Sequence, residues 1–129
     1  MNEHYIEALK ALAEPNRLRL LWLLIQVNQR ITIAEAMDVT GDTQYNASRN
    51  LKILYKAKLL TQEKQGKWVY YTLMPQFEPH LEKLVESVRS LPQEGFVDIM
   101  SRCKKRLSMR VNGECMVGPN SEEWLGKVS

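Results

Sequence analysis

The polar and basic side chains with the clearest chemistry gather between residues 43 and 67. This segment carries six basic residues and one acidic residue, so its net charge of +5 exceeds the +3 of the whole chain. Such a concentration of positive charge can neutralise the phosphates of a nucleic acid and release their condensed counterions, which gives affinity without sequence preference. The six basic residues are Arg49, Lys52, Lys56, Lys58, Lys64 and Lys67.

The first part of this segment, residues 43–58, predicts a helix with two distinct faces. Ala47, Leu51 and Leu54 share one stripe, and Lys58 falls on the same stripe. The opposite face is polar, aromatic and basic, and we expect it to touch base edges near its start and backbone phosphates further along. The predicted DNA-contacting residues of this helix are Thr43, Gln44, Tyr45, Ser48, Arg49, Lys52 and Lys56.

A basic hairpin is predicted to follow this helix. Residues 59–64 and 67–73 are strand-like and are joined around Gln65 and Gly66, where glycine allows the positive φ of a two-residue turn. If the preceding helix occupies the DNA major groove, the hairpin tip would reach the flanking DNA backbone or minor groove. The tip residues expected there are Lys64, Gln65 and Lys67. These three residues complete the predicted DNA-contacting set.

The preceding elements are those needed to position a recognition helix. The spacing predicts a short helix from Tyr5 to about Ala13, then a second helix that starts at Pro15 and is almost wholly apolar over residues 18–27. Thr32 and Glu35 form a capping-box pattern that opens a short helix over residues 33–39. The turn Thr40-Gly41-Asp42 then leads into the two-faced helix, so the order is that of a helix-turn-helix.

The C-terminal third continues with more helix and a second turn signal. One helix is expected after Pro79, and a last helix carries Phe96, Met100, Cys103 and Leu107 on one stripe. Asn-Gly within residues 109–117 predicts a second small hairpin. The polar tail should fray unless Trp124 docks.

Three ordered motifs resemble the ArsR/SmtB family of transcriptional repressors. They are ALAEPNRLRLL at residues 11–21, SRNLKIL at residues 48–54 and GKWVYYTL at residues 66–73. The resemblance spans residues 5–91 and implies a mainly α winged helix-turn-helix protein with a β-hairpin wing. It also implies a homodimer on double-stranded DNA, at an operator that is usually an inverted repeat, released when an effector binds.

The resemblance further implies that dimerisation uses the first helix and the helix within residues 77–91. We therefore expect two parts in the chain. Residues 1–91 would form a winged-helix DNA-binding and dimerisation domain, and residues 92–129 a C-terminal extension of one helix, a hairpin and a polar tail.

The metal sites usual in that family are missing from this sequence. No Cys lies in or near residues 31–39, so the Cys-x-Cys motif is absent. The dimer-helix pattern of Asp-x-His and a distant His pair is also absent, because Leu91 and Glu94 stand where the second pair would lie.

Cys103 and Cys115 are the remaining candidates for effector sensing. Two thiolates could bind a soft metal or metalloid or form a disulfide, and the basic residues around Cys103 could lower its pKa. Alternatively both thiols are structural, because Cys103 lies on an apolar stripe where a thiol behaves as a small core residue. An organic effector, or none, also fits the sequence.

Composition excludes several protein classes. In 129 residues the longest apolar run is Leu20–Ile25, six residues where a membrane span needs roughly 20. The first residues lack a basic flank and an apolar stretch, so no export signal is expected and the protein should be cytoplasmic. Glycine-rich phosphate loops, a nucleophile elbow and paired metal-ligand spacings are missing, so we do not expect an enzyme.

One alternative function uses the same fold. A winged helix can serve protein–protein contact, in which case salt would barely change partner affinity. Replacing Arg49 or Lys52 with alanine would then leave the function intact.

Overall fold

Two helices open the chain where their residue pattern predicts them. The computed structural model describes residues 3–129, so the first two residues of the expected 1–91 domain lie outside the described range. Helix α1 spans Glu3–Leu12 and α2 spans Pro15–Val27. The side chain of Glu14 accepts a hydrogen bond from the backbone N–H of Arg17 at 2.9 Å, and Pro15 occupies the first turn, where no N–H is needed.

The helix-turn-helix consists of α3 (Ile33–Thr40) and α4 (Gln44–Lys56). The predicted capping box is present, because the side chains of Thr32 and Glu35 each accept a hydrogen bond from the other residue's backbone N–H. Gly41 ends α3 with a φ of 78°, a left-handed conformation that favours glycine. Thr43 then caps α4, so both helix starts are fixed by local hydrogen bonds.

A three-stranded antiparallel sheet carries the wing. Its strands are β1 (Ile31–Thr32), β2 (Leu60–Gln65) and β3 (Trp68–Leu73), in the order β1-β3-β2. Gln65 pairs with Trp68, so the two-residue turn consists of Gly66 and Lys67, one position later than predicted. Gly66 has a φ of 63°, and glycine at the first turn position with positive φ matches the twist of the strands.

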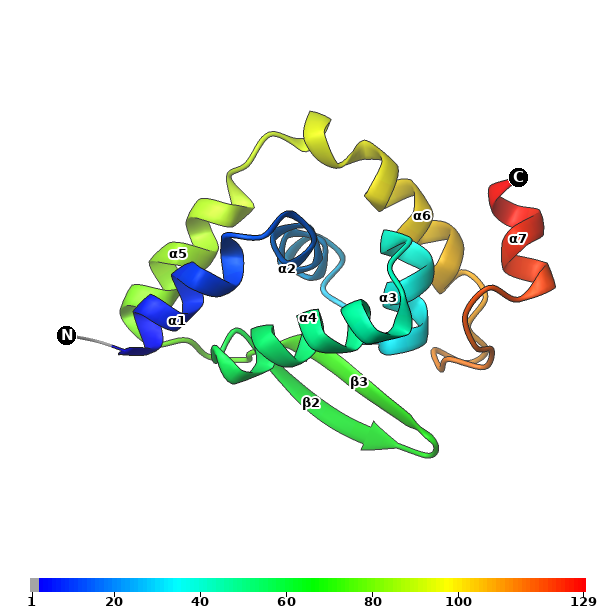
Figure 1. Cartoon of the computed structure of the whole chain (residues 1–129), viewed down its shortest axis with the longest axis horizontal. Helices are drawn as coiled ribbons and strands as arrows, with labels where there is room; N and C mark the ends of the chain where they lie inside the picture. The colour runs from blue at the N-terminus through cyan, green and yellow to red at the C-terminus, as the bar shows by residue number, and fades with distance from the viewer. Residues whose placement is uncertain (1–2) are drawn as a thin grey trace.

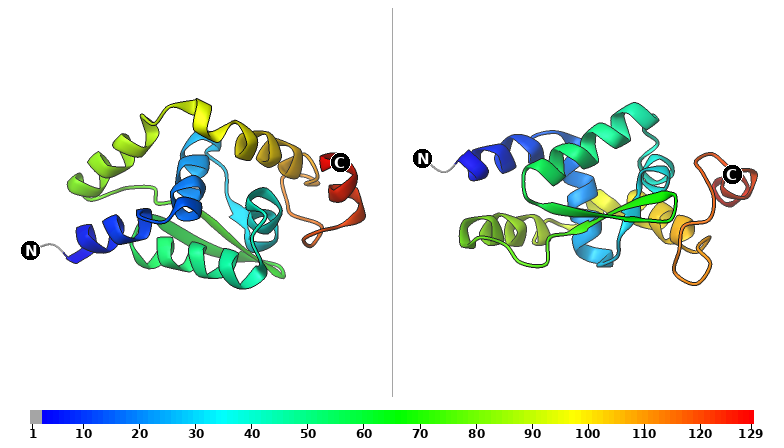
Figure 2. Two further views of the ribbon diagram at one scale, coloured as in Figure 1. Left: turned by 45° about the horizontal axis from the view of Figure 1, so that its top comes forward. Right: turned by 90° about the horizontal axis from the view of Figure 1, so that it is seen from below.

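The remaining helices lie at the two ends of the molecule. Helix α5 spans Pro79–Arg89, a 3-10 turn η1 covers Gln93–Phe96, α6 spans Val97–Leu107 and α7 spans Glu122–Val128. Figures 1 and 2 show α1 and α5 together at one end of the molecule and α6 and α7 at the other. The tail does not fray, because Trp124 is only 1% exposed.

The core forms around α2, whose residues from Leu20 to Ile25 are all buried. Figure 1 shows α2 at the centre, with α1, α4, α5 and α6 around it, which explains why this helix is apolar on nearly every side. The mainly α winged helix-turn-helix expected from the sequence is confirmed.

Two local expectations are wrong. Lys58 does not extend the core stripe of α4, because the helix ends at Lys56 and Lys58 adopts a left-handed φ of 66° with an exposed side chain. The chain reverses there toward β2, and the apolar Leu59 takes the buried position.

The second hairpin is reduced to one bridge between Val111 and Glu114. Asn112 and Gly113 do form the tight turn, both with positive φ. Strands do not extend from it because Met109 and Cys115, which flank the bridge, are buried against the rest of the protein.

Candidate nucleic-acid interface

The outer face of α4 is an exposed surface of polar, aromatic and basic side chains. Ala47, Leu51 and Leu54 are buried and fix the orientation of the helix. The predicted contact residues therefore point outward; Tyr45 is 73% exposed, and Ser48 is half-buried. Six of the seven predicted residues of this helix line a shallow hollow of about 770 Å³: Gln44, Tyr45, Ser48, Arg49, Lys52 and Lys56. The seventh, Thr43, caps the helix through a 3.2 Å hydrogen bond from the backbone N–H of Asn46.

The basic side chains of this face are available for a partner. Within residues 3–129, none of Arg49, Lys52 and Lys56 forms an ion pair. Figures 1 and 2 show the β2–β3 hairpin running beside α4, with its tip at the end where α4 begins. Exposed basic side chains therefore lie on two adjoining elements, α4 and the wing, a distribution that suits binding to a phosphate backbone.

The three predicted residues at the wing tip differ in their surroundings. Lys64 and Lys67 are exposed, and the Lys67 ammonium lies 5.1 Å from the ring centroid of Trp68. Gln65 is exposed too, but its side-chain amide is engaged: its oxygen accepts from Arg30, and its nitrogen donates to Glu114 at 3.0 Å. Gln65 thus joins the wing to the C-terminal extension.

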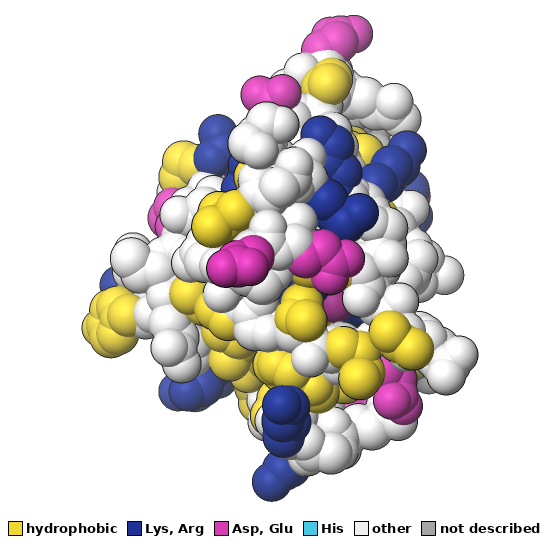
Figure 3. Space-filling view, turned by 90° about the vertical axis from the view of Figure 1, so that its right-hand side faces the viewer, with side chains coloured by type: hydrophobic (Ala, Val, Ile, Leu, Met, Phe, Trp, Pro, Cys, Tyr) yellow, Lys and Arg dark blue, Asp and Glu magenta, His cyan; other side chains and the backbone are white. Residues whose placement is uncertain are grey.

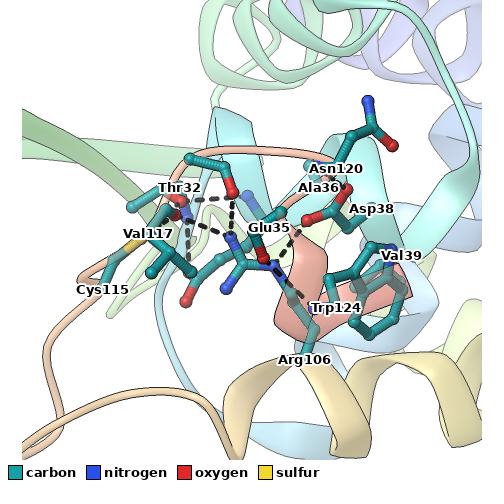
Figure 4. A network of polar contacts seen from close by, with 12 residues as sticks. Thr32, Glu35, Ala36, Asp38, Val39, Arg106, Cys115, Val117, Asn120 and Trp124 are labelled. Atoms are coloured by element: carbon teal, nitrogen blue, oxygen red, sulfur yellow. Dashed lines mark hydrogen bonds and ion pairs between the residues drawn. The ribbon is translucent and has the colours of Figure 1, made fainter. Parts of the chain in front are cut away.

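The C-terminal extension is attached to α3 by buried ion pairs that were not predicted from the sequence. Arg106 donates to the carboxylate of Asp38 at 2.7 Å, and both side chains are at most 1% exposed. Figure 4 shows Arg106 between Asp38 and Val117, whose carbonyl accepts a second hydrogen bond from this guanidinium at 2.8 Å. Asn120 adds a backbone N–H to Asp38 at 2.9 Å, so this buried carboxylate is well satisfied.

Two further arginines strengthen the same attachment. Arg110 bonds both carboxylate oxygens of Glu35, at 2.7 and 2.8 Å. Arg102 donates to the backbone carbonyls of Asp38 and Val39 near the end of α3. The available signal was the spacing of Arg102 and Arg106, because positions four residues apart share one helix face, whereas Arg110 lies beyond the end of α6.

The extension also contacts the start of α3 and the wing. The backbone N–H of Cys115 donates to the Tyr70 hydroxyl in β3 at 2.9 Å, and the Thr32 hydroxyl donates to the Cys115 sulfur at 3.5 Å. Figure 3 shows this side of the molecule, where acidic and basic side chains lie next to each other above an apolar area. The extension is therefore packed against both α3 and the wing.

The two cysteines are free thiols in buried positions, each 1% exposed. Burial, with a smaller contribution from the nearby Glu35 carboxylate, raises the pKa of Cys103 to about 11. The expectation that neighbouring basic residues lower this pKa is therefore wrong, because Lys104 and Lys105 are exposed and Arg106 is turned to Asp38. Burial also raises the pKa of Cys115.

The described part of the chain has neither a metal-binding cluster nor a membrane-spanning helix. Residues 3–129 contain no group of three or more His, Cys, Asp or Glu side chains that could hold a metal ion. No helix in this range has the length and apolar character needed to span a membrane.

Comparison with known proteins places this architecture among transcription regulators. A helix-turn-helix domain family matches residues 12–63. The arsenical resistance operon repressor of Escherichia coli (strain K12) is 30% identical over 89 residues, which cover 69% of this chain and 75% of the relative. The protein of the same name from Bacillus subtilis (strain 168) is 36% identical over 69 residues, 54% of this chain and 65% of the relative. An uncharacterized HTH-type transcriptional regulator of Methanocaldococcus jannaschii is 30% identical over 86 residues, 67% of this chain and 96% of the relative.

These relatives favour DNA binding over a protein-contact module, and they make the chain a transcriptional regulator rather than an enzyme. The exposed face of α4, its basic wing and the shared sequence agree: the chain belongs to the ArsR family of winged helix-turn-helix transcriptional repressors.

Proposed function

We propose that the protein is a homodimeric repressor that binds an inverted-repeat operator. The observation that carries this proposal is the pairing of an outward-facing, uncompensated Arg49 and Lys52 on α4 with Lys64 and Lys67 on the adjoining wing. α4 would enter the major groove, with its first turns at the base edges, while the wing contacts flanking phosphates.

A dimer is supported by the free end of the molecule where α1 and α5 lie together. Leu9 is 45% exposed there, and Leu12 and Leu84 are only partly buried. A two-fold axis between two copies of this end would bury these side chains and place two α4 helices in symmetric half-sites. An inverted repeat is the operator that such symmetry recognises.

Fluorescence anisotropy against the duplex upstream of the protein's own gene tests this function. A scrambled duplex of equal length serves as the control, and both are measured at two salt concentrations. We expect tighter, salt-sensitive binding to the upstream duplex, with two chains per site. Absence of binding to either duplex at low salt would refute the proposal and favour protein–protein contact.

We further propose that a thiophilic effector, such as a trivalent arsenical, releases the DNA through Cys115 and Cys103. Two relatives are named arsenical resistance operon repressors, which supports this ligand class. The Cys115 sulfur accepts a hydrogen bond from the hydroxyl of Thr32, the N-cap of α3, so this thiol is in direct contact with the start of that helix. A ligand on these sulfurs would therefore disturb the start of the helix-turn-helix.

The effector proposal is tested by adding phenylarsine oxide to the preformed DNA complex. We expect release from the wild type and none from Cys103→Ser or Cys115→Ser. If both variants release DNA as the wild type does, the cysteines are structural.

A further inference from the structure

A groove remote from the exposed face of α4 lies between α2, η1 and one face of α6. Its volume of about 640 Å³ falls within the range of small-molecule sites, roughly 300–1,000 Å³. The side chains that matter for its chemistry are Trp22, Phe96, Val97, Met100, Lys104 and Lys105.

One wall of this groove is aromatic and apolar. Trp22 and Phe96 are stacked with ring centroids 4.2 Å apart and an angle of 7° between their planes. Met100 is partly buried beside them, and Val97 is 63% exposed although it is apolar. Because Trp22 and Phe96 are already almost fully buried, the apolar surface that a flat molecule would cover belongs mainly to Val97 and Met100.

The wall also contains an unused hydrogen-bond donor. Trp22 is 1% exposed, and its indole Nε1 is the one buried side-chain nitrogen or oxygen in residues 3–129 that has no hydrogen-bond partner. A buried donor without an acceptor is costly, so a ligand whose acceptor atom reached this nitrogen would bind more favourably.

The rim of the groove is positively charged. Lys104 and Lys105 are both exposed, and neither ammonium forms an ion pair anywhere in the described part of the chain. No Asp or Glu lines the groove. The charge therefore complements an anion, and a carboxylate can accept charge-assisted hydrogen bonds from both ammonium groups.

We propose that this groove binds a small aromatic carboxylate, with its ring on the apolar wall that Val97 and Met100 expose and its carboxylate between Lys104 and Lys105. The regulatory consequence rests on the proposed function. The same helix, α6, holds α3 through Arg102 and Arg106, so a ligand on its outer face can bias the position of the helix-turn-helix. This site is separate from the two thiols.

Isothermal titration calorimetry with 2-naphthoate tests the groove on the whole chain without DNA. We expect one 2-naphthoate per chain and binding of the neutral 2-naphthalenemethanol that is weaker by roughly tenfold or more, because charge-assisted hydrogen bonds are the stronger ones. The double variant Lys104→Gln/Lys105→Gln should bind 2-naphthoate more weakly by a similar factor. The matched control Lys83→Gln/Lys127→Gln should bind it with the affinity of the wild type. Ser101→Trp, at an exposed position on the lining of the groove, should block binding without unfolding the protein.

Three results would overturn the proposal. One is the absence of 2-naphthoate binding, and another is equal affinity for the acid and the alcohol. The third is a fall in oligomeric state of Ser101→Trp in sedimentation experiments, which would make the groove an interface between copies of the chain. The calorimetry needs no DNA, so failure of the proposed repressor function would leave its outcome unchanged.

Discussion

Arg106 is the single residue on which the attachment of the C-terminal extension to α3 depends most. Its guanidinium neutralises Asp38 at a site where both side chains are almost fully buried, and it also satisfies the carbonyls of Val117 and Gly118. A buried carboxylate that loses its partner cannot recover its hydration, so the two charges are strongly interdependent.

Arg106→Met should lower the free energy of unfolding by about 3–5 kcal/mol, because it leaves the Asp38 carboxylate buried without its counter-ion. Urea denaturation followed by circular dichroism measures this loss. Lys105→Met, at the exposed neighbouring position, is the control and should change stability by less than about 0.5 kcal/mol. Equal stability of the two variants would show that the ion pair contributes nothing to the fold.

Cys103 predicts a pH dependence of stability at alkaline pH. Its pKa rises from 9.0 to about 11 on folding because burial disfavours the thiolate. The thiol therefore favours the folded state fully below about pH 9, and this contribution is lost as the pH rises toward 11. The difference in unfolding free energy between wild type and Cys103→Ala should shrink over that window. A difference that stays constant with pH would contradict the raised pKa.

At the scale of elements, the wing has exposed lysines at its tip and is also attached to the extension. Lys64 and Lys67 are exposed at its tip, whereas Gln65 is bonded to Arg30 and Glu114 and Tyr70 is bonded to Cys115. The lysines can therefore act on phosphates while the rest of the hairpin is held in place.

Lys67→Ala should weaken binding to operator and scrambled duplexes by a similar factor and reduce the salt slope of binding by about one. The physical reason is that one phosphate contact releases counterions without reading a base. Anisotropy titrations over a salt series measure the slope, with Lys127→Ala as the charge-matched control. An unchanged slope would show that the Lys67 side chain does not contact a DNA phosphate.

Elements whose ends are set by local hydrogen bonds could be predicted from the sequence. The Thr32–Glu35 capping box and the left-handed Gly41 lie within a few residues of the helix ends that they define. The wing was predicted with a one-residue error in its turn, because the residue pattern fixes the strands better than the register.

Contacts between distant segments could not be predicted in the same way. Arg110 and Glu35 are 75 positions apart, and their pairing depends on the path that the chain takes after α6 ends. The pKa of Cys103 was misjudged for the same reason, since it depends on three-dimensional burial rather than on neighbouring basic residues. The docking of Trp124 likewise needed the folded surface of α6.

At the scale of the whole molecule, the elements with different proposed roles lie in different places. α1 and α5 occupy one end, the reading face of α4 and the wing lie along one side, and the C-terminal extension closes the other end (Figure 1). The extension contacts α3 and the wing at once, so a ligand that moved it would act on the wing directly and on α4 through α3.

The central claim is that the exposed face of α4 reads DNA sequence, and Arg49→Ala tests it most directly. Anisotropy should show a loss of about 1–3 kcal/mol in binding to the operator, because a bidentate contact to a guanine would be removed. Binding to the scrambled duplex should fall far less, and Lys127→Ala should match the wild type on both duplexes. Wild-type affinity of Arg49→Ala for the operator, or an equal loss on both duplexes, would contradict the claim that this face reads bases.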